Sequence, residues 1–244
     1  MKVRFKLSLI LLTGLIASFA TAQTLAESKS GTAAHGNYIN LPSIDIIRII
    51  PQPPELGSLA AMADLETVLR VQASRSDDQI AWAKQVEKDS IYMYQPIVGS
   101  WFTKDNLPLT LAFIKQVEQD AVSLSYRLKG IYNRPRPFLV SKEVVPCVSL
   151  PKSGSYPSNH SLQAYTRAAV LAEIFPEKRE ALFAFAHQIA WGRIIGGVHF
   201  PTDIVGGRIL SEALIKELLN NPKFIDQVNK ARSEVAPFVL KKAA

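Results

Sequence analysis

The sequence predicts an all-α fold in a single domain. Apolar residues recur at every third or fourth position over nearly the whole chain after Glu55, whereas alternating β-branched segments bounded by turn residues are almost absent. With 244 residues and 48% hydrophobic composition, the chain can bury one core of ordinary domain size. Its single cysteine, Cys147, excludes an intrachain disulfide, so the apolar core must hold the fold.

Residues 1–22 have the pattern of a secretory signal peptide. Three basic residues precede an apolar run over residues 7–20, and the small residues Ala20-Thr21-Ala22 follow. The run is shorter than the roughly 20 residues that span a bilayer. We expect cleavage before Gln23 and a periplasmic or secreted mature protein.

The mature chain is only mildly basic. The signal peptide holds three of the 28 Lys and Arg residues and none of the 21 Asp and Glu residues, so the formal charge falls from +7 to 25 − 21 = +4. No basic run or aromatic-interleaved basic stripe occurs, which argues against nucleic acid as a partner. No apolar run of 18 residues follows Ala22, so we expect no membrane span in the mature chain. The mildly positive charge of the mature chain suits a small anionic substrate.

The mature chain is expected to begin with a flexible arm and to continue as the helical domain. The arm covers residues 23–43, and the domain covers residues 44–240. An extended apolar strap, SIDIIRIIPQPPELG, leads into the first long helix near Glu55, and residues 92–106 form a loop with a short helix. Apolar spacing predicts helices over residues 55–73, 76–90, 107–129, 158–175, 177–195, 201–219 and 222–235.

Helix-ending residues place several polar side chains at the end of a predicted helix. Gly130 stands where a stop is expected for the helix that ends at Lys129. Pro135 and Pro137 then favour extended conformations for the two residues before them, Arg134 and Arg136.

Two further helix starts carry histidines. Ser158 is a good N-cap, which puts Asn159 and His160 in the first turn of the helix that follows. Downstream, Gly196-Gly197 ends the helix that holds Arg193, and Pro201 fits the first position of the next one, just after His199.

The chemistry of these groups points to phosphate. If Lys129, Arg136 and Arg193 meet in one cleft, a multiply charged anion is needed to offset their mutual repulsion. The free amides at the helix start around Ser158 and Asn159 can bind an oxyanion, and the helix dipole adds to the attraction.

The two imidazoles divide the roles of nucleophile and acid–base catalyst. A neutral His199, oriented by a hydrogen bond to Asp203, can attack phosphorus in line. His160 can then protonate the leaving oxygen and later deprotonate the attacking water. Ser158 lacks the Gly-x-Ser-x-Gly elbow of a serine hydrolase, and no P-loop or His-Glu-x-x-His element occurs.

Three ordered motifs resemble one known family. KGIYNRPRP fits Lys, six residues, Arg-Pro; PSNH fits Pro-Ser-Gly-His; and GRIIGGVHFPTD fits Ser-Arg, five residues, His, three residues, Asp. This is similar to the signature of the type-2 phosphatidic acid phosphatase superfamily, and the exported setting resembles the bacterial class A non-specific acid phosphatases. The resemblance implies a compact all-α fold and hydrolysis of phosphomonoesters of broad range, with an acid preference, a phosphohistidine at His199, and neither metal nor cofactor.

The sequence departs from that family pattern at two positions. Asn159 stands in place of the usual Gly, and Gly192 in place of the usual Ser. Arg134 also precedes a proline, so it shares the pattern that selects Arg136.

Three other functions remain open at this point: a vanadate-dependent haloperoxidase with a similar anion site, a soluble lipid phosphatase, and a phosphate-binding protein without turnover. The spacing of His199 and Asp203 also suits metal ligands, a role that persistence of activity in EDTA would argue against. The sequence is also compatible with a homo-oligomer.

Overall fold

The protein is described by a computed structural model over residues 36–39 and 46–240. Within these ranges every regular element is a helix, which confirms the predicted all-α class. None of the helices in the described ranges combines the length and the apolar character needed to cross a bilayer. The predicted signal peptide and all of the predicted arm except residues 36–39 lie outside the described residues.

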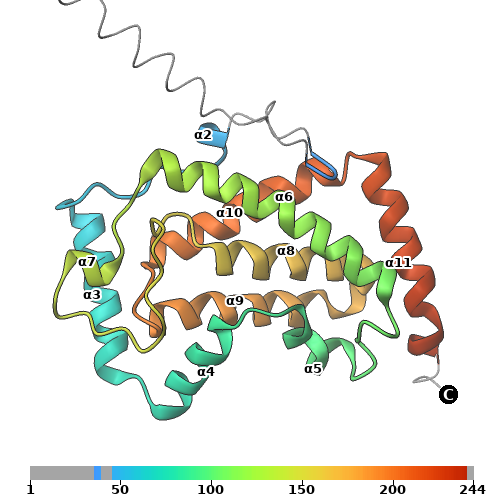
Figure 1. Cartoon of the computed structure of the whole chain (residues 1–244), viewed down its shortest axis with the longest axis horizontal. Coiled ribbons are helices and arrows are strands. Elements are labelled where there is room, and N and C mark those ends of the chain that lie inside the picture. Colours follow the sequence, from blue (N-terminus) through green and yellow to red (C-terminus); the bar gives the residue numbers. More distant parts are fainter. Residues whose placement is uncertain (1–35, 40–45, 241–244) are drawn as a thin grey trace, which may run out of the picture. The chain divides into compact units, whose positions relative to one another are not determined.

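The elements follow the chain in the order shown in Figure 1. They are α2 (Ile46–Ile49), α3 (Leu59–Ser74), α4 (Asp77–Glu87), the 3-10 helix η2 (Ile91–Tyr94), α5 (Gln95–Val98), α6 (Pro108–Tyr132), α7 (Pro137–Val140), α8 (Asn159–Ile174), the 3-10 helix η3 (Pro176–Lys178), α9 (Arg179–Ile195), α10 (Pro201–Leu218) and α11 (Pro222–Leu240).

Helix α8 is the central element of the domain. Twelve of its sixteen residues are buried, and it packs against α9, α10 and α6 (Figure 1). Two glycines let α10 approach closely: a Cβ at Gly207 would lie 2.6 Å from the carbonyl oxygen of Ser158, and one at Gly206 would lie 2.6 Å from the ring of Tyr156. This close crossing brings the start of α10 against the start of α8.

The predicted entry to the first long helix was wrong in two details. Helix α3 begins at Leu59, not near Glu55, because Ser58 is the N-cap and its Oγ accepts from the amide of Ala61 at 3.2 Å. The segment predicted as a wholly extended strap contains the short helix α2.

The predicted stop at Gly130 was also wrong. Helix α6 continues to Tyr132 and ends at Asn133, whose φ of 41° is left-handed and whose amide donates to the carbonyl of Lys129 at 2.9 Å. Asn tolerates this conformation through its short polar side chain, so it takes the role expected of Gly. Arg136 is extended as predicted, but the segment that follows it turns at once into α7.

Candidate functional site

Three basic side chains from separate parts of the chain are buried close to one another. Lys129 comes from α6, Arg136 from the residue before α7, and Arg193 from the last turn of α9; their exposed fractions are 5%, 3% and 2%. All three charges lower the pKa of the same imidazole, that of His199. The structure therefore brings together the cations that the sequence motifs selected.

Lys129 and Arg136 hold the loop before α8 through its backbone. Lys129 Nζ donates to the carbonyl oxygens of Gly154 and Ser155 at 2.8 and 3.3 Å. Arg136 Nη2 donates to the same Gly154 oxygen at 3.2 Å, and its Nη1 donates to the carbonyl of Val198 at 2.7 Å. Both cations are thus fixed by neutral acceptors.

Arg193 differs from these two because part of its guanidinium has no partner. Its Nε and Nη1 atoms are buried and make no hydrogen bond to any described residue. A buried donor left unsatisfied costs about 1–3 kcal/mol. Burial lowers the pKa of Arg193 to about 10, although Glu87 and Asp89 oppose that shift. These free donors are suited to an anion that enters the site.

The imidazole of His199 is fixed at both nitrogens. Its Nδ1 lies 3.1 Å from Oδ2 of Asp203, and its Nε2 lies 3.0 Å from Nη1 of Arg136. Because a guanidinium only donates, Nε2 must present its lone pair, and Nδ1 carries the proton. Burial and the charge of Arg136 hold the pKa of His199 well below its usual range, which favours this neutral form.

The second imidazole, His160, lies in the first turn of α8. Its Nε2 donates to the carbonyl of Glu87, the last residue of α4, over a long 3.4 Å, so Nδ1 is the nitrogen that can exchange a proton with a ligand. Burial, followed by the charge of Arg193, lowers the pKa of His160 to about 4.

Ser158 and Asn159 lie at the start of α8 with their side chains already engaged. Ser158 Oγ accepts from the amide of Ser161 at 3.3 Å, and its own amide donates to the carbonyl of Asp203 at 3.0 Å. Asn159 Oδ1 accepts from Ser125 Oγ. What this turn can offer an anion is its backbone amides and the helix dipole.

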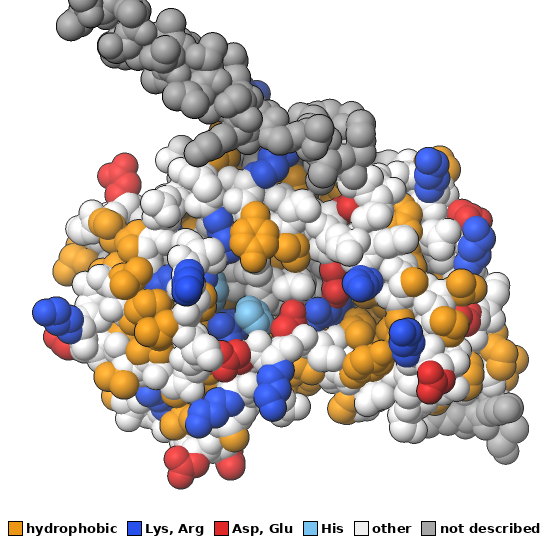
Figure 2. Space-filling model, in the orientation of Figure 1, with side chains coloured by type: hydrophobic (Ala, Val, Ile, Leu, Met, Phe, Trp, Pro, Cys, Tyr) orange, Lys and Arg blue, Asp and Glu red, His pale blue; other side chains and the backbone are white. Residues whose placement is uncertain are grey.

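Burial disfavours the charged forms of the cations in this cluster. Burial, and then the neighbouring Arg136, lowers the pKa of Lys129 to about 7, and burial lowers that of Arg136 to about 10. A bound anion would reverse both shifts, because an opposite charge nearby favours the protonated form. Figure 2 shows histidine in a central hollow beside basic and acidic side chains.

Sequence reasoning left Arg134 unresolved and missed its partner Asp64. Arg136 contacts His199. Arg134 instead contacts two carboxylates: its Nη1 donates to Oδ1 of Asp203 at 2.7 Å, and its Nη2 pairs with Asp64 of α3 at 2.7 Å. The near-complete burial of Asp64, 4% exposed, comes from tertiary packing and has no local sequence signal.

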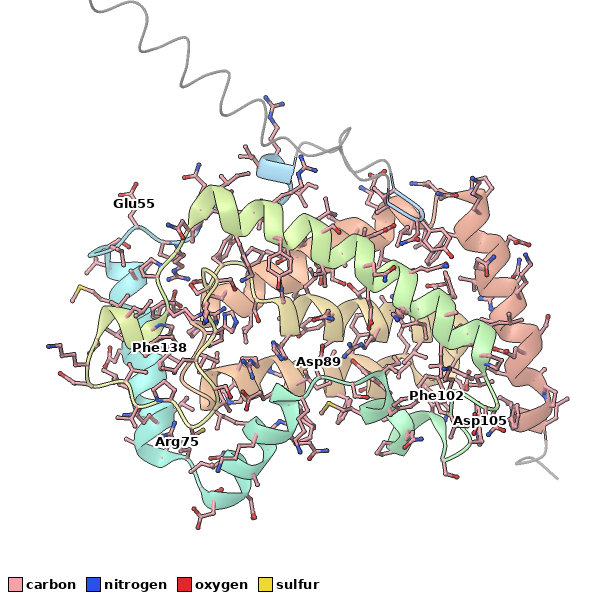
Figure 3. All side chains as sticks on the ribbon, viewed as in Figure 1. Glu55, Arg75, Asp89, Phe102, Asp105 and Phe138 are labelled. Atoms are coloured by element: carbon pink, nitrogen blue, oxygen red, sulfur yellow. The ribbon has the colours of Figure 1, made fainter. Side chains whose placement is uncertain are left out.

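A cavity of about 550 Å³ shares two charged residues with the surroundings of His160. Asp89 and Arg167 contribute to its wall, and the charges of both act on the pKa of His160. Figure 3 shows Asp89 just after α4, over the α8–α9 pair. Ile91, Leu111, Lys104, Lys115 and Glu118 are also among the residues that line the cavity. Within the described residues, no group of three or more His, Cys, Asp or Glu side chains is arranged to hold a metal ion.

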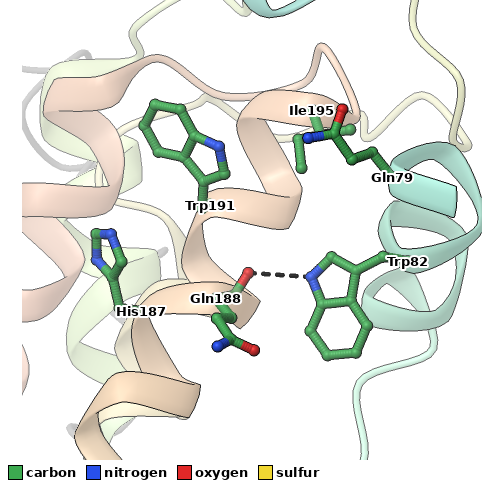
Figure 4. Close-up of a pocket in the computed structure, with 6 residues that line it drawn as sticks. All are labelled: Gln79, Trp82, His187, Gln188, Trp191 and Ile195. Carbon is green, nitrogen blue, oxygen red and sulfur yellow. Dashed lines mark hydrogen bonds between the residues drawn. The ribbon is translucent and has the colours of Figure 1, made fainter. Parts of the chain in front are cut away.

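Gly192, the second departure from the family pattern, lies where α4 packs on α9. A Cβ there would come within 3.1 Å of Val86 Cγ2 and 3.3 Å of Trp82 Nε1. The same indole nitrogen donates to the carbonyl of Gln188 at 3.2 Å (Figure 4). Gly192 thus permits a close contact between α9, which carries Arg193, and α4, which contacts His160.

We expect Gly192→Ala to lower the free energy of unfolding by about 1 kcal/mol. Overpacking by the added methyl group costs about 1–3 kcal/mol. This cost exceeds the roughly 1 kcal/mol gained because Ala has a higher helix propensity than Gly. Gly130→Ala is the matched control, since a Cβ there meets nothing within 4 Å, and it should raise stability by about 0.5–1 kcal/mol. Urea unfolding of both variants checks this, and equal stabilisation by both would contradict it.

Comparison with known proteins identifies relatives over most of the chain. Residues 109–224 match the PAP2 superfamily. The chain is 29% identical over 210 residues to the non-specific acid phosphatase of Providencia stuartii, covering 81% of this chain and 83% of that protein. It is 25% identical over 198 residues to the non-specific acid phosphatase of Salmonella typhimurium, covering 76% and 78%. The acid phosphatase of Zymomonas mobilis is 23% identical over 243 residues, covering 95% and 90%.

Two solved structures share the helical fold. A bacterial vanadium-dependent iodoperoxidase has a TM-score of 0.59 and 20% identity, covering 73% of this chain and 54% of that one. A bacterial vanadium-dependent chloroperoxidase has a TM-score of 0.61 and 12% identity, covering 81% and 53%. This chain spans about half the length of these peroxidases, and the likeness concerns the fold alone.

Proposed function

We propose that this chain, whose residues 109–224 match the PAP2 superfamily, is an exported, metal-independent acid phosphatase that hydrolyses phosphomonoesters through a phosphohistidine on His199. The observation that supports this most is the buried guanidinium of Arg193, whose Nε and Nη1 lack partners next to two imidazoles. An anion bound there would satisfy donors that the fold leaves free. The acid phosphatase relatives support the same reaction class.

The first chemical step transfers the phosphoryl group to the protein. Nε2 of His199 attacks phosphorus in line, so that a P–N bond forms as the P–O bond to the leaving group breaks. Arg136 Nη1, which donates to Nε2 at 3.0 Å, must first move its hydrogen bond to a phosphate oxygen. His160 gives a proton to the leaving oxygen.

The second step releases inorganic phosphate. His160, now neutral, takes a proton from water, the water oxygen attacks phosphorus, and the P–N bond breaks. Throughout both steps Lys129, Arg136 and Arg193 bind the equatorial oxygens, whose charge redistributes in the transition state. Asp203 keeps the proton on Nδ1 of His199, so Nε2 is regenerated with its lone pair.

The position of the cavity supports a broad substrate range. In-line attack places the leaving group opposite His199, and Asp89 and Arg167, whose charges act on His160, line the cavity of about 550 Å³. Apolar, acidic and basic side chains all line it, so leaving groups of different chemistry can be accommodated.

Hydrolysis of para-nitrophenyl phosphate by the purified mature chain tests this proposal. We expect turnover that persists in EDTA and is inhibited by vanadate, since vanadate resembles phosphate in shape and charge. A protein that only binds phosphate would show no turnover. A haloperoxidase would instead oxidise halide when vanadate and peroxide are added together.

We expect kcat/KM to rise as the pH falls from about 8 to about 5, because kcat/KM reports the ionisation of the free enzyme. His160 must be protonated, and its pKa is lowered to about 4, so the active fraction grows as the pH falls toward that value. Lys129 must be charged, and its charge is lost as the pH rises through about 7.

Bound phosphate raises both pKa values, so the alkaline limb of kcat should lie at higher pH than that of kcat/KM. Initial rates over a substrate series at each pH separate the two profiles. A kcat/KM that stays flat from about pH 5 to about pH 9 would contradict the roles given to both groups.

A further inference from the structure

A buried network extends from the proposed nucleophile to α3 through Arg134. This arginine is 4% exposed and lies on the connection between α6 and α7. Its Nη1 donates to Oδ1 of Asp203 and to Thr202 Oγ1, both at 2.7 Å, and its Nη2 donates to Asp64 at 2.7 Å. Its guanidinium also lies over the ring of Phe200, 4.2 Å from the centroid. Its Nε is buried and makes no hydrogen bond to any described residue.

Asp64 connects the same network to the start of α10. Its Oδ1 accepts from the amide of Thr202 at 3.2 Å, and its Oδ2 accepts from the hydroxyl of the same residue. Thr202 lies in the first helical turn, where backbone amides have no partner inside the helix. One buried carboxylate from α3 thus caps α10 and pairs with the arginine that holds Asp203.

Asp203 depends on this pairing because of where it lies. It is fully buried, with 0% exposure, and burial raises its pKa while Arg134 lowers it. During attack on phosphorus, positive charge builds up on the ring of His199, and an ionised Asp203 stabilises that charge. A protonated Asp203 would lose this effect.

The polar and titratable groups around Asp203 come from several elements. Its oxygens contact Arg134, His199, the amide of Phe200 and, at 3.4 Å, Ser155 Oγ. Groups whose pKa values are electrostatically linked to Asp203 are Lys129, Arg136 and Tyr156. Among the direct contacts, Arg134 is the permanent cation.

We propose that Arg134 and Asp64 are positioning residues: Arg134 keeps Asp203 ionised and aimed at Nδ1 of His199, and Asp64 holds Arg134 in place. This inference rests on the proposed phosphohistidine chemistry, but its physical content is the ionisation of Asp203, which exists without substrate. Asp64 has a second effect: it shares the guanidinium of Arg134 and so limits how strongly that cation acts on Asp203.

Two variants should shift the titration of Asp203 in opposite directions. Asp64→Asn keeps the shape and the acceptor for Thr202 but removes a negative charge, so the pKa of Asp203 should fall. The double variant Arg134→Gln with Asp64→Asn removes one charge of each sign and leaves Asp203 without its contacting cation. The pKa of Asp203 should then rise by about one unit or more.

Carbon NMR of protein labelled at aspartate carboxyls measures this titration in the substrate-free chain. The acid limb of the kcat/KM profile should shift in the same direction as the pKa of Asp203, to lower pH in Asp64→Asn and to higher pH in the double variant. KM should change less than about twofold. Arg134→Lys should keep the limb near its original position, since it retains the charge.

Asp120→Asn is the matched control. Asp120 is also buried, at 2% exposure, but its Oδ1 and Oδ2 accept from the amides of Asn37 and Tyr38, away from the site. It should leave the titration of Asp203 unchanged. An Asp203 that titrates at the same pH in the parent, Asp64→Asn and double-variant proteins would overturn the inference. A parent protein that does not hydrolyse phosphomonoesters would instead overturn the proposed function, while the NMR titration still tests the network.

Discussion

Replacement of His199 by Ala is expected to reduce kcat by about ten-thousand-fold or more, because it removes the atom that we propose to bond to phosphorus. Arg136, Lys129 and Arg193 remain, so binding of inorganic phosphate should persist. Stopped assays with para-nitrophenyl phosphate measure the loss of kcat. Thermal melting with and without phosphate shows that the anion site is intact.

His187→Ala serves as the matched control for this change. His187 is an exposed histidine of the same helix as Arg193 and stacks on Trp191, with ring centroids 6.5 Å apart. It should retain turnover within about twofold, as expected for a surface substitution. Retention of more than a tenth of kcat by His199→Ala would be incompatible with a nucleophilic role.

Replacement of Arg193 by Met is expected to stabilise the phosphate-free protein while reducing kcat/KM by about a hundred-fold or more. Met matches much of the arginine volume without its charge or its unsatisfied Nε and Nη1 donors. Each unsatisfied buried donor costs about 1–3 kcal/mol, so the free energy of unfolding should rise by about that amount. Loss of a cation that binds the transition state accounts for the kinetic defect.

Arg167 is the matched comparison for Arg193, because it is also buried but its guanidinium is paired. Arg167 is as deeply buried, at 3% exposure, but each of its three side-chain nitrogens is paired with Asp89 or Glu118. Arg167→Met should therefore destabilise the protein by about 3–5 kcal/mol, because two carboxylates lose their partner. Urea unfolding in phosphate-free buffer compares the two. Equal destabilisation by both substitutions would show that Arg193 is structurally satisfied.

Helix ends could be predicted from the sequence where a single residue type determines the local backbone conformation. Helix α10 begins at Pro201 and α9 ends at Ile195, as the sequence predicts, because Pro favours the first helical position and Gly196-Gly197 ends the helix before it. At Gly130 the same rule failed. A helix tolerates an exposed glycine at a modest cost, and Asn133 provided an alternative stop three residues later.

The site was predictable from its motif residues but not from its supporting contacts. Charge, helix ends and family resemblance select Lys129, Arg136, Arg193 and the two histidines that we propose to be catalytic. Asp64 could not be predicted, because an acidic residue on an amphipathic helix is ordinarily exposed and only the packing of α3 beside α10 buries it. The role of Gly192 likewise depends on Val86 and Trp82, which are distant in the chain.

Trapping of the covalent intermediate tests the central claim most directly. Rapid quenching of the enzyme during turnover of a radiolabelled phosphomonoester, followed by peptide mapping, should place the label on His199 through an acid-labile, alkali-stable bond. His160→Ala should still form this adduct with a good leaving group and should hydrolyse it more slowly. Label on any other residue, or turnover with direct transfer to water and no adduct, would contradict the account.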